Sequence, residues 1–249
     1  NNDNLLNKSK KINNNNEIAV YGSSYNNHIE FINYLNIKNI VFNNYALDSY
    51  GLDQIFLSYK LTASQNKNKT ILIGFLLEDL DRSIFNKREY NKVIFSKINN
   101  TFEPDNIPIK FENNKKTNFD LYLFKFLQNF YNLILDDFDP RKNQCKIALK
   151  KELFIFFINE IKKISAKYNQ KIIVVTYNLK QDLTGEPSWR YKFIKNHLHK
   201  EDITHVDSYE ILKKKSLNNL NEIDTYFGKD LHNNSKSFEF IIENIIRKL

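Results

Sequence analysis

Apolar residues in this chain alternate between short continuous runs and longer stretches of helical spacing. The short runs cover residues 17–21, 39–42, 70–77, 171–177 and 203–206. Between them, apolar positions recur every three or four residues over 29–35, 52–64, 147–168, 190–197 and 237–249. Continuous runs are typical of strands buried on both faces, and helical spacing indicates amphipathic helices. The order therefore predicts a three-layer α/β sandwich with a mostly parallel sheet of about five strands.

One stretch interrupts this alternation, from residue 80 to residue 140. Within it, residues 92–95 and 107–111 flank a polar segment that contains Pro104, which predicts a hairpin. Residues 119–135 are very rich in Phe, Tyr and Leu, and such aromatics more often pack in a core than line a ligand site. We interpret residues 80–140 as a small insertion or cap on the main domain.

The two ends and the single cysteine set further limits. Residues 1–16 are rich in Asn and Lys with little apolar pattern, so we expect a disordered lead-in before a domain that spans 17–249. The chain has no Met and begins with Asn1, so we expect that a signal peptide, an anchor or another domain has been removed. Cys145 is the only cysteine, which excludes an internal disulfide. No run approaches the roughly 20 apolar residues of a membrane span.

The net charge of +8 and the pI of about 9.2 permit nucleic acid as a partner. However, the lysines are spread along the chain and mixed with acidic residues, and only Lys213, Lys214 and Lys215 form a tight basic run. A general excess of Asn, Lys and Ile raises the pI without a functional cause. Nucleic-acid binding is therefore kept only as a second alternative.

Glycine is scarce in this chain, with five in 249 residues. Four of the five, Gly22, Gly51, Gly74 and Gly228, stand beside segments that could carry chemistry. We expect them to mark turns that need positive φ or a close approach of the backbone. Because ligands bind at the carboxyl ends of strands in open parallel sheets, the glycines point to one edge of the sheet.

Two short motifs near the ends of the chain hold the residue types of a serine hydrolase. Ser23 and Ser24 follow Gly22 directly after the first predicted strand, and Asp230 and His232 stand close to the C-terminus. A serine hydroxyl becomes a good nucleophile when a base takes its proton, and imidazole titrates near neutral pH. An adjacent carboxylate fixes the tautomer of the imidazole and stabilises the imidazolium. Taken singly, the serines also fit a turn or a helix N-cap, and the Asp/His pair also fits a surface loop.

Jointly, over roughly residues 17–249, these motifs resemble the SGNH/GDSL hydrolase family. The first strand of that family ends in Gly-Asp-Ser, so Ser24 matches the nucleophile, while Ser23 replaces the Asp. Asp230 and His232 match the remaining two residues of the triad, with the Asp-x-His spacing of some branches. The resemblance implies a flavodoxin-like SGNH fold in which His232 is the base and Asp230 orients it.

Two internal segments extend the resemblance and supply candidate residues for the oxyanion hole and substrate. Residues 44–54 follow the segment Asn-x-Gly-x-x-Gly-Tyr-Gly-x-Asp-Gln of some branches, with Gly51 retained. At the position of Ser49 the family has a glycine whose backbone N–H binds the oxyanion. Glu78 and Asp79 match the end of strand-Gly-x-x-Asn-Asp, but Glu78 replaces the Asn that donates to the oxyanion. An ionised Glu cannot donate, so these departures leave retained catalysis open.

Other polar residues carry weaker signals. Asn234 fits the Asn that often follows the triad His in the family. His28 follows the nucleophile turn closely, so we expect it near the pocket. Arg82 is expected to pair with one of the carboxylates that precede it, with contact to an anionic substrate as the less favoured alternative. His197 and His199 sit two apart, but no carboxylate or cysteine shares a metal-ligand spacing with them.

The resemblance implies a serine-dependent ester hydrolase, or a carbohydrate O-acyl esterase or transferase, that works through an acyl-Ser24 intermediate. It implies no metal or organic cofactor, and a small-molecule or glycan ester as substrate. It also favours an extracytoplasmic or periplasmic location, with the cytoplasm as the alternative. The first alternative function is a catalytically inactive binding or assembly module of the same fold, and the second is the nucleic-acid-binding protein considered above.

Overall fold

The computed structural model describes residues 17–85, 92–105, 140–216 and 220–249. The predicted lead-in 1–16, the predicted strand 107–111 and the aromatic stretch 119–135 lie outside the described residues. Within the described part, no helix is both long enough and apolar enough to cross a bilayer.

A five-stranded parallel sheet forms the centre of the molecule, with the strand order β2-β1-β3-β6-β7. Its strands are β1 (Glu17–Gly22), β2 (Val41–Asn44), β3 (Thr70–Leu76), β6 (Lys171–Tyr177) and β7 (Thr204–Asp207). All five correspond to the predicted apolar runs, and parallel pairing requires the helical crossovers that the periodicity indicated. The predicted α/β sandwich with a parallel sheet of about five strands is therefore confirmed.

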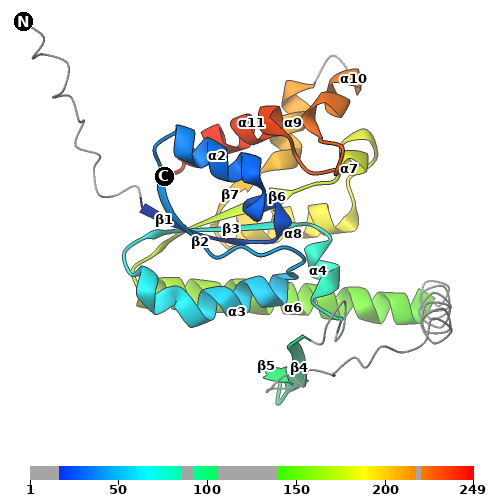
Figure 1. Ribbon diagram of the computed structural model, residues 1–249. Coiled ribbons are helices and arrows are strands. Elements are labelled where there is room, and N and C mark those ends of the chain that lie inside the picture. The colour runs from blue at the N-terminus through cyan, green and yellow to red at the C-terminus, as the bar shows by residue number, and fades with distance from the viewer. Residues whose placement is uncertain (1–16, 86–91, 106–139, 217–219) are drawn as a thin grey trace, which may run out of the picture.

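Helices connect the strands and cover both faces of the sheet (Figure 1). The longer ones are α2 (Ile29–Ile37), α3 (Leu52–Thr62), α6 (Pro140–Lys167), α8 (Trp189–Lys200), α9 (Ser208–Lys215) and α11 (Ser235–Ile246). The short helices and 3-10 turns are α1 (Ser24–Asn27), η2 (Ala63–Asn66), α4 (Asp79–Arg82), α7 (Lys180–Thr184), α10 (Leu220–Ile223) and η3 (Asp224–Tyr226).

Two hydrophobic cores result, one on each face of the sheet. Side chains alternate between the faces along a strand, so in β1 Ile18 and Val20 enter one core while Ala19 and Tyr21 enter the other. The core of Ile18 and Val20 is closed by α2 and α11, and the opposite core is closed by α3, α6 and α8. Burial on both faces explains why the central strands β1, β3 and β6 are almost continuous apolar runs.

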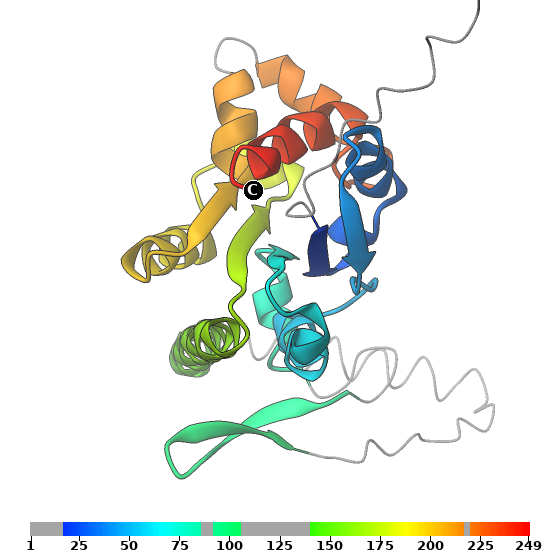
Figure 2. The same cartoon turned by 90° about the vertical axis from the view of Figure 1, so that its left-hand side faces the viewer.

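A separate two-stranded hairpin of β4 (Ile94–Ile98) and β5 (Thr101–Asp105) lies on the outer side of α3 and α6 (Figure 2). Phe95 packs on Phe56 of α3 with ring centroids 5.8 Å apart, and Phe102 packs on Phe156 of α6 at 5.5 Å. The hairpin therefore extends the core of α3 and α6, and among the described residues of the predicted insertion only Arg82 lines the cavity described below.

The predicted hairpin exists, but the position predicted for its turn was wrong. Residues 96–106 were expected to form the connection, but Thr101–Asp105 is itself the second strand, antiparallel to Ile94–Ile98. The turn is Asn99-Asn100, and both residues have positive φ, 48° and 64°. A two-residue type I′ hairpin turn needs positive φ at both central positions, and Asn tolerates it better than other non-glycine residues.

Among the residues that the structure describes, asparagine takes most of the left-handed positions, and glycine takes none. Positive φ occurs at Asn39, Asn68, Asn99, Asn100, Asn169, Ser49, Asp202 and Leu231, and at none of the five glycines, all of which are described. Of the two predicted reasons for these glycines, positive φ does not apply, and close backbone approach is confirmed. A Cβ on Gly74 would lie 2.0 Å from Oδ1 of Asn26, and one on Gly22 would lie 2.4 Å from the same atom.

Candidate active site

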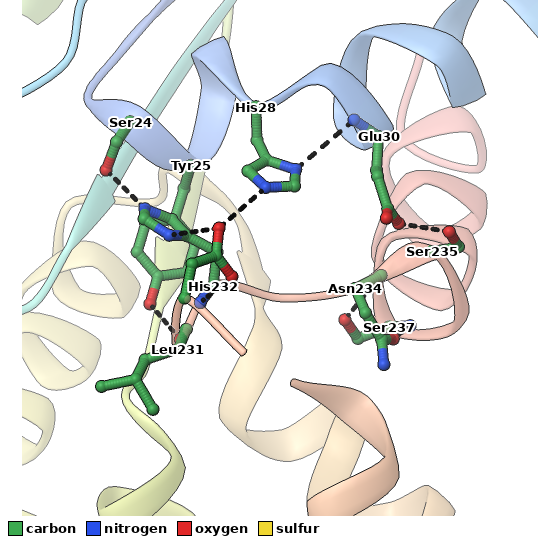
Figure 3. Close-up of polar contacts among 10 residues, drawn as sticks. Ser24, Tyr25, His28, Glu30, Leu231, His232, Asn234, Ser235 and Ser237 are labelled. Carbon is green, nitrogen blue, oxygen red and sulfur yellow. Dashed lines mark hydrogen bonds and ion pairs between the residues drawn. The ribbon is translucent and has the colours of Figure 1, made fainter. Parts of the chain in front are cut away.

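The two predicted end motifs meet at the carboxyl end of the sheet (Figure 3). Ser24 Oγ lies 2.8 Å from His232 Nε2, although 208 residues separate them in the sequence. This distance is within hydrogen-bond reach, which a general base needs to take a proton from a nucleophile. The fold thus joins a residue directly after the first strand to a residue directly before the last helix.

A tight turn presents Ser24. The strand β1 ends at Gly22, and Ser24 is the first residue of α1, whose N-cap Ser23 accepts hydrogen bonds at its carbonyl from the N–H groups of Asn26 (3.1 Å) and Asn27 (3.2 Å). The side chain of Asn26 fills the space beside the two strand-end glycines and donates to the hydroxyl of Tyr177 (3.1 Å). Because Asn26 is fully buried, these contacts fix α1 against β1, β3 and the end of β6.

A closed loop presents the Asp/His pair. The N–H of Gly228 donates to the carbonyl of His232 (2.8 Å), and Phe227 and Asn233 form an antiparallel bridge. The predicted family residue Asn234 caps α11, because its side chain accepts from the N–H groups at positions 236 and 237. A side-chain acceptor of this kind satisfies N–H groups that the helix leaves unpaired, so Asn234 anchors the loop to the final helix.

The link between Asp230 and His232 is close but poorly directed. Asp230 Oδ2 lies 3.3 Å from His232 Nδ1, yet this buried nitrogen forms no hydrogen bond. The other carboxylate oxygen accepts from the backbone N–H of His232 (3.2 Å). Burial opposes ionisation of Asp230, but the N–H and imidazole of His232, together with His28, hold the pKa of this carboxyl below its usual range.

Ser49 reaches the site because its loop continues along the edge of β1. The N–H of Tyr45 donates to the carbonyl of Val20 (2.8 Å), and Asn27 Nδ2 donates to Asp48 Oδ1 (3.1 Å). Ser49 then adopts φ of 66°, in the left-handed region. The family has a glycine at this position, the residue that takes such a conformation without strain.

A cavity of about 420 Å³ opens at these residues. It is lined by Ser24, Tyr25, Asp48, Ser49, Leu76, Arg82, Leu179, Asp230, Leu231 and His232. Four of the seven predicted site residues thus line one cavity, namely Ser24, Ser49, Asp230 and His232. The other three, Gly51, Glu78 and Asp79, are not among its lining residues.

Two of those three residues support the wall of the cavity from behind. Asp79 is fully buried, accepts from the N–H of Leu76 (2.9 Å) and pairs with Arg82 through Nη1 (2.5 Å), so the predicted pairing of Arg82 is confirmed. Gly51 packs against the same arginine, since a Cβ at this glycine would lie 2.9 Å from Arg82 Cβ. These contacts hold the start of α4, and with it Arg82, at the cavity.

Glu78 stands where the family has an oxyanion donor, but its surroundings favour a neutral acid. Its Oε2 is buried without a hydrogen-bond partner. Burial, and secondarily the nearby carboxylate of Asp182, raises the pKa of Glu78 to about 7. In its ionised form the side chain has no proton to donate to an oxyanion.

Sequence reasoning missed the contribution of Tyr25. Its ring packs on His232 at 4.7 Å between centroids and on Tyr177 at 4.9 Å, and its hydroxyl donates to the carbonyl of Leu231 (3.5 Å). Its place directly after Ser24 was the available signal. Leu76 at the end of β3, Arg82 after β3 and Leu179 after β6 also line the cavity, as expected from the rule that ligands bind at the strand ends.

Three side chains at this site have the types and spacing of metal ligands. Ligand atoms of His28, Asp230 and His232 all lie within 4.8 Å of one another. However, His28 Nδ1 accepts from the N–H of Glu30, which leaves the proton of a neutral imidazole on Nε2, the nitrogen that faces Asp230. A protonated nitrogen cannot ligate a metal, so the geometry favours hydrogen bonding within this group.

Comparisons with known proteins agree with this architecture. No family model and no curated protein matches the chain. Among solved structures, a member of the lipolytic G-D-S-L family from Veillonella parvula superposes with a TM-score of 0.51 at 10% identity, covering 93% of this chain and 96% of its own. A G-D-S-L family protein from Desulfitobacterium hafniense gives a TM-score of 0.54 at 10% identity, covering 94% and 100%.

The chain has the SGNH/GDSL hydrolase fold. A third structure, of a candidate acylhydrolase from Bacteroides fragilis, superposes with a TM-score of 0.52 at 10% identity and covers 95% of this chain and 86% of its own. The expected SGNH/GDSL resemblance thus holds at the level of the fold over nearly the whole length. At 10% identity the likeness shows the fold alone.

Proposed function

We propose that this protein is a serine-dependent ester hydrolase, or a related O-acyl esterase or transferase, with Ser24 as nucleophile. The single observation that carries the proposal is the 2.8 Å contact between Ser24 Oγ and His232 Nε2 in a cavity at the strand ends. A turn residue and a surface-loop residue without a joint role have no reason to meet in this way. The meeting therefore also favours an enzyme over an inactive binding module.

The reaction begins when Ser24 Oγ attacks the ester carbonyl carbon and His232 Nε2 takes the hydroxyl proton. Asp230 stabilises the imidazolium that forms. The tetrahedral intermediate carries an oxyanion, for which we assign the backbone N–H groups of Ser24 and Ser49. Collapse breaks the bond to the alcohol oxygen, which receives the proton from His232, and leaves acyl-Ser24.

The second half of the cycle repeats these roles with a new nucleophile. His232 takes a proton from water, or from the hydroxyl of an acceptor sugar, as its oxygen attacks the acyl carbon. Collapse breaks the bond to Ser24 Oγ, which receives the proton from His232, and releases the acyl group. Water gives hydrolysis, and a sugar gives acyl transfer. The cavity of about 420 Å³, lined by apolar Leu76, Leu179 and Leu231 beside polar Asp48 and Arg82, fits a small acyl ester on a polar alcohol.

The test measures kcat/KM on p-nitrophenyl esters of increasing acyl length, for wild type, Ser24→Ala and His232→Ala. We expect the highest activity on the short acyl chains, and a loss of more than about 1000-fold in each variant. Addition of a carbohydrate acceptor separates transfer from hydrolysis by the appearance of an acylated sugar. Wild-type turnover equal to that of Ser24→Ala on every ester would contradict the proposal and favour the binding module.

A further inference from the structure

A second histidine, His28, lies beside His232 (Figure 3), and both imidazoles contact the carboxylate of Asp230. His28 Nε2 and His232 Nδ1 each lie 3.3 Å from the same oxygen, Asp230 Oδ2. The two imidazole rings stack with centroids 5.4 Å apart and an interplanar angle of 23°. The candidate triad is thus extended to a chain of Ser24, His232, Asp230 and His28.

The tautomer of His28 is set by its place in the fold. His28 is the N-cap of α2, and its Nδ1 accepts from the N–H of Glu30 (3.4 Å). A neutral imidazole with an accepting Nδ1 carries its proton on Nε2, so His28 donates to Asp230 Oδ2. The ring is also packed against Phe238, with centroids 5.6 Å apart. The start of a helix therefore points a fixed N–H donor at the carboxylate.

Asp230 needs such a donor because little else restrains its Oδ2 atom. The side chain of Asp230 is 56% exposed, whereas the Asp of a serine triad typically is buried and held by hydrogen bonds. Its contact with His232 Nδ1 is not a directed hydrogen bond, and the backbone N–H of His232 restrains only Oδ1. Without a donor on Oδ2, an exposed carboxylate rotates into water.

We propose that His28 is a positioning residue of this site: its Nε2–H holds Oδ2 of Asp230 against His232, in place of the donors that a buried carboxylate would have. This inference rests on the proposed function for its effect on rate. The hydrogen bond itself, however, is a property of the folded protein and can be tested without turnover.

Two substitutions separate the capping role of His28 from its contact with Asp230. Asn is a preferred N-cap but is too short to reach the carboxylate, so His28→Asn keeps the cap and loses the contact. Gln is a poor N-cap, but its amide reaches about as far as Nε2, so His28→Gln loses the cap and keeps a donor. Thermal unfolding and kcat/KM are measured for both variants beside wild type.

We expect the two measurements to rank the variants in opposite orders. His28→Asn should melt close to wild type and lose about ten-fold in kcat with little change in KM, because a hydrogen bond to a charged group is lost. His28→Gln should melt lower but retain more of kcat than His28→Asn. Activity that instead follows stability, with His28→Asn at the wild-type rate, would overturn the proposal and leave His28 as a cap alone.

NMR spectroscopy tests the hydrogen bond between His28 and Asp230 independently of whether the proposed catalytic function is correct. In 15N-histidine-labelled protein, His28 should be protonated at Nε2 and unprotonated at Nδ1. In 13C-labelled protein, His28→Asn should raise the pKa of Asp230 toward its ordinary value, while His28→Gln should not. These results are expected even if Ser24→Ala and wild type prove equally inactive. A proton on Nδ1 of His28 would overturn the positioning role. A pKa of Asp230 that is the same in His28→Asn as in wild type would overturn it as well.

Discussion

The position that the family fills with an oxyanion donor gives a sharp test of how burial controls charge beside this site. We consider Glu78→Gln, which removes the ionisable group and nearly preserves the shape of the side chain. Glu78 Oε2 is buried without a hydrogen-bond partner, and burial, followed by repulsion from Asp182, raises the pKa of Glu78 to about 7. The ionised form is therefore disfavoured in the folded protein relative to the unfolded chain.

The sign of the effect follows from proton linkage. Glu78 has a pKa of 4.5 as its reference value and about 7 in the folded state. Between these two pH values the unfolded chain releases the proton first, so rising pH favours unfolding, and the loss is complete above pH 7. At about 1.4 kcal/mol per pH unit the upper bound is about 3 kcal/mol, which partial exposure reduces to about 1–2 kcal/mol.

The assay is urea unfolding of wild type and Glu78→Gln at pH 4.5, 6 and 8, because these values span the reference and folded pKa of Glu78. We expect the stability of Glu78→Gln relative to wild type to rise by about 1–2 kcal/mol from the lowest to the highest pH. Glu186→Gln, at an exposed position, makes the same change in net charge and serves as the control. A difference between Glu78→Gln and wild type that stays constant with pH would refute the reasoning.

Three further substitutions test the elements around the site. Ser49→Gly should keep kcat/KM within about two-fold and slightly raise Tm, because it relieves a left-handed φ while preserving the backbone N–H; a ten-fold loss of kcat/KM would instead indicate a role for the hydroxyl. Lys92→Met should lower the free energy of unfolding by about 3 kcal/mol, since it leaves buried Asp53, 2.6 Å from Lys92 Nζ, without its cation; an unchanged urea midpoint would contradict this. Gly74→Ala should destabilise by about 2 kcal/mol in the same assay, because its Cβ would overlap Asn26 Oδ1 at 2.0 Å; a wild-type midpoint would show that the asparagine can move.

Much of the fold could be predicted because the three central strands of the sheet, β1, β3 and β6, are largely buried on both faces. β3 and β6 therefore consist of almost unbroken apolar residues, and the helices between strands keep a regular apolar stripe. The hairpin turn at Asn99-Asn100 was missed because asparagine replaces glycine at left-handed positions in this chain. A sequence rule that expects Gly at the positive-φ positions of hairpin turns fails in a chain that has few glycines and many asparagines.

The candidate site also contains residues that the sequence predicted and contacts that it did not. Ser24 and His232 follow from residue type and position in the chain, because parallel strands bring their carboxyl ends to one edge. The contact of His28 with Asp230 could not be predicted, since it depends on which imidazole nitrogen caps α2 and on the closure of a distant loop. Glu78 matched a family position by sequence, but the backbone after β3 leaves it outside the cavity.

Covalent labelling of Ser24 is the most direct measurement of the proposed chemistry. An alkyl fluorophosphonate reacts with a serine whose proton is taken by a neighbouring base, and peptide mapping by mass spectrometry identifies the modified residue. We expect a single adduct on Ser24 in wild type, no adduct in Ser24→Ala, and much slower labelling in His232→Ala because the base 2.8 Å from Oγ is removed. Labelling of wild type that does not exceed that of Ser24→Ala would contradict the assignment of Ser24 as nucleophile.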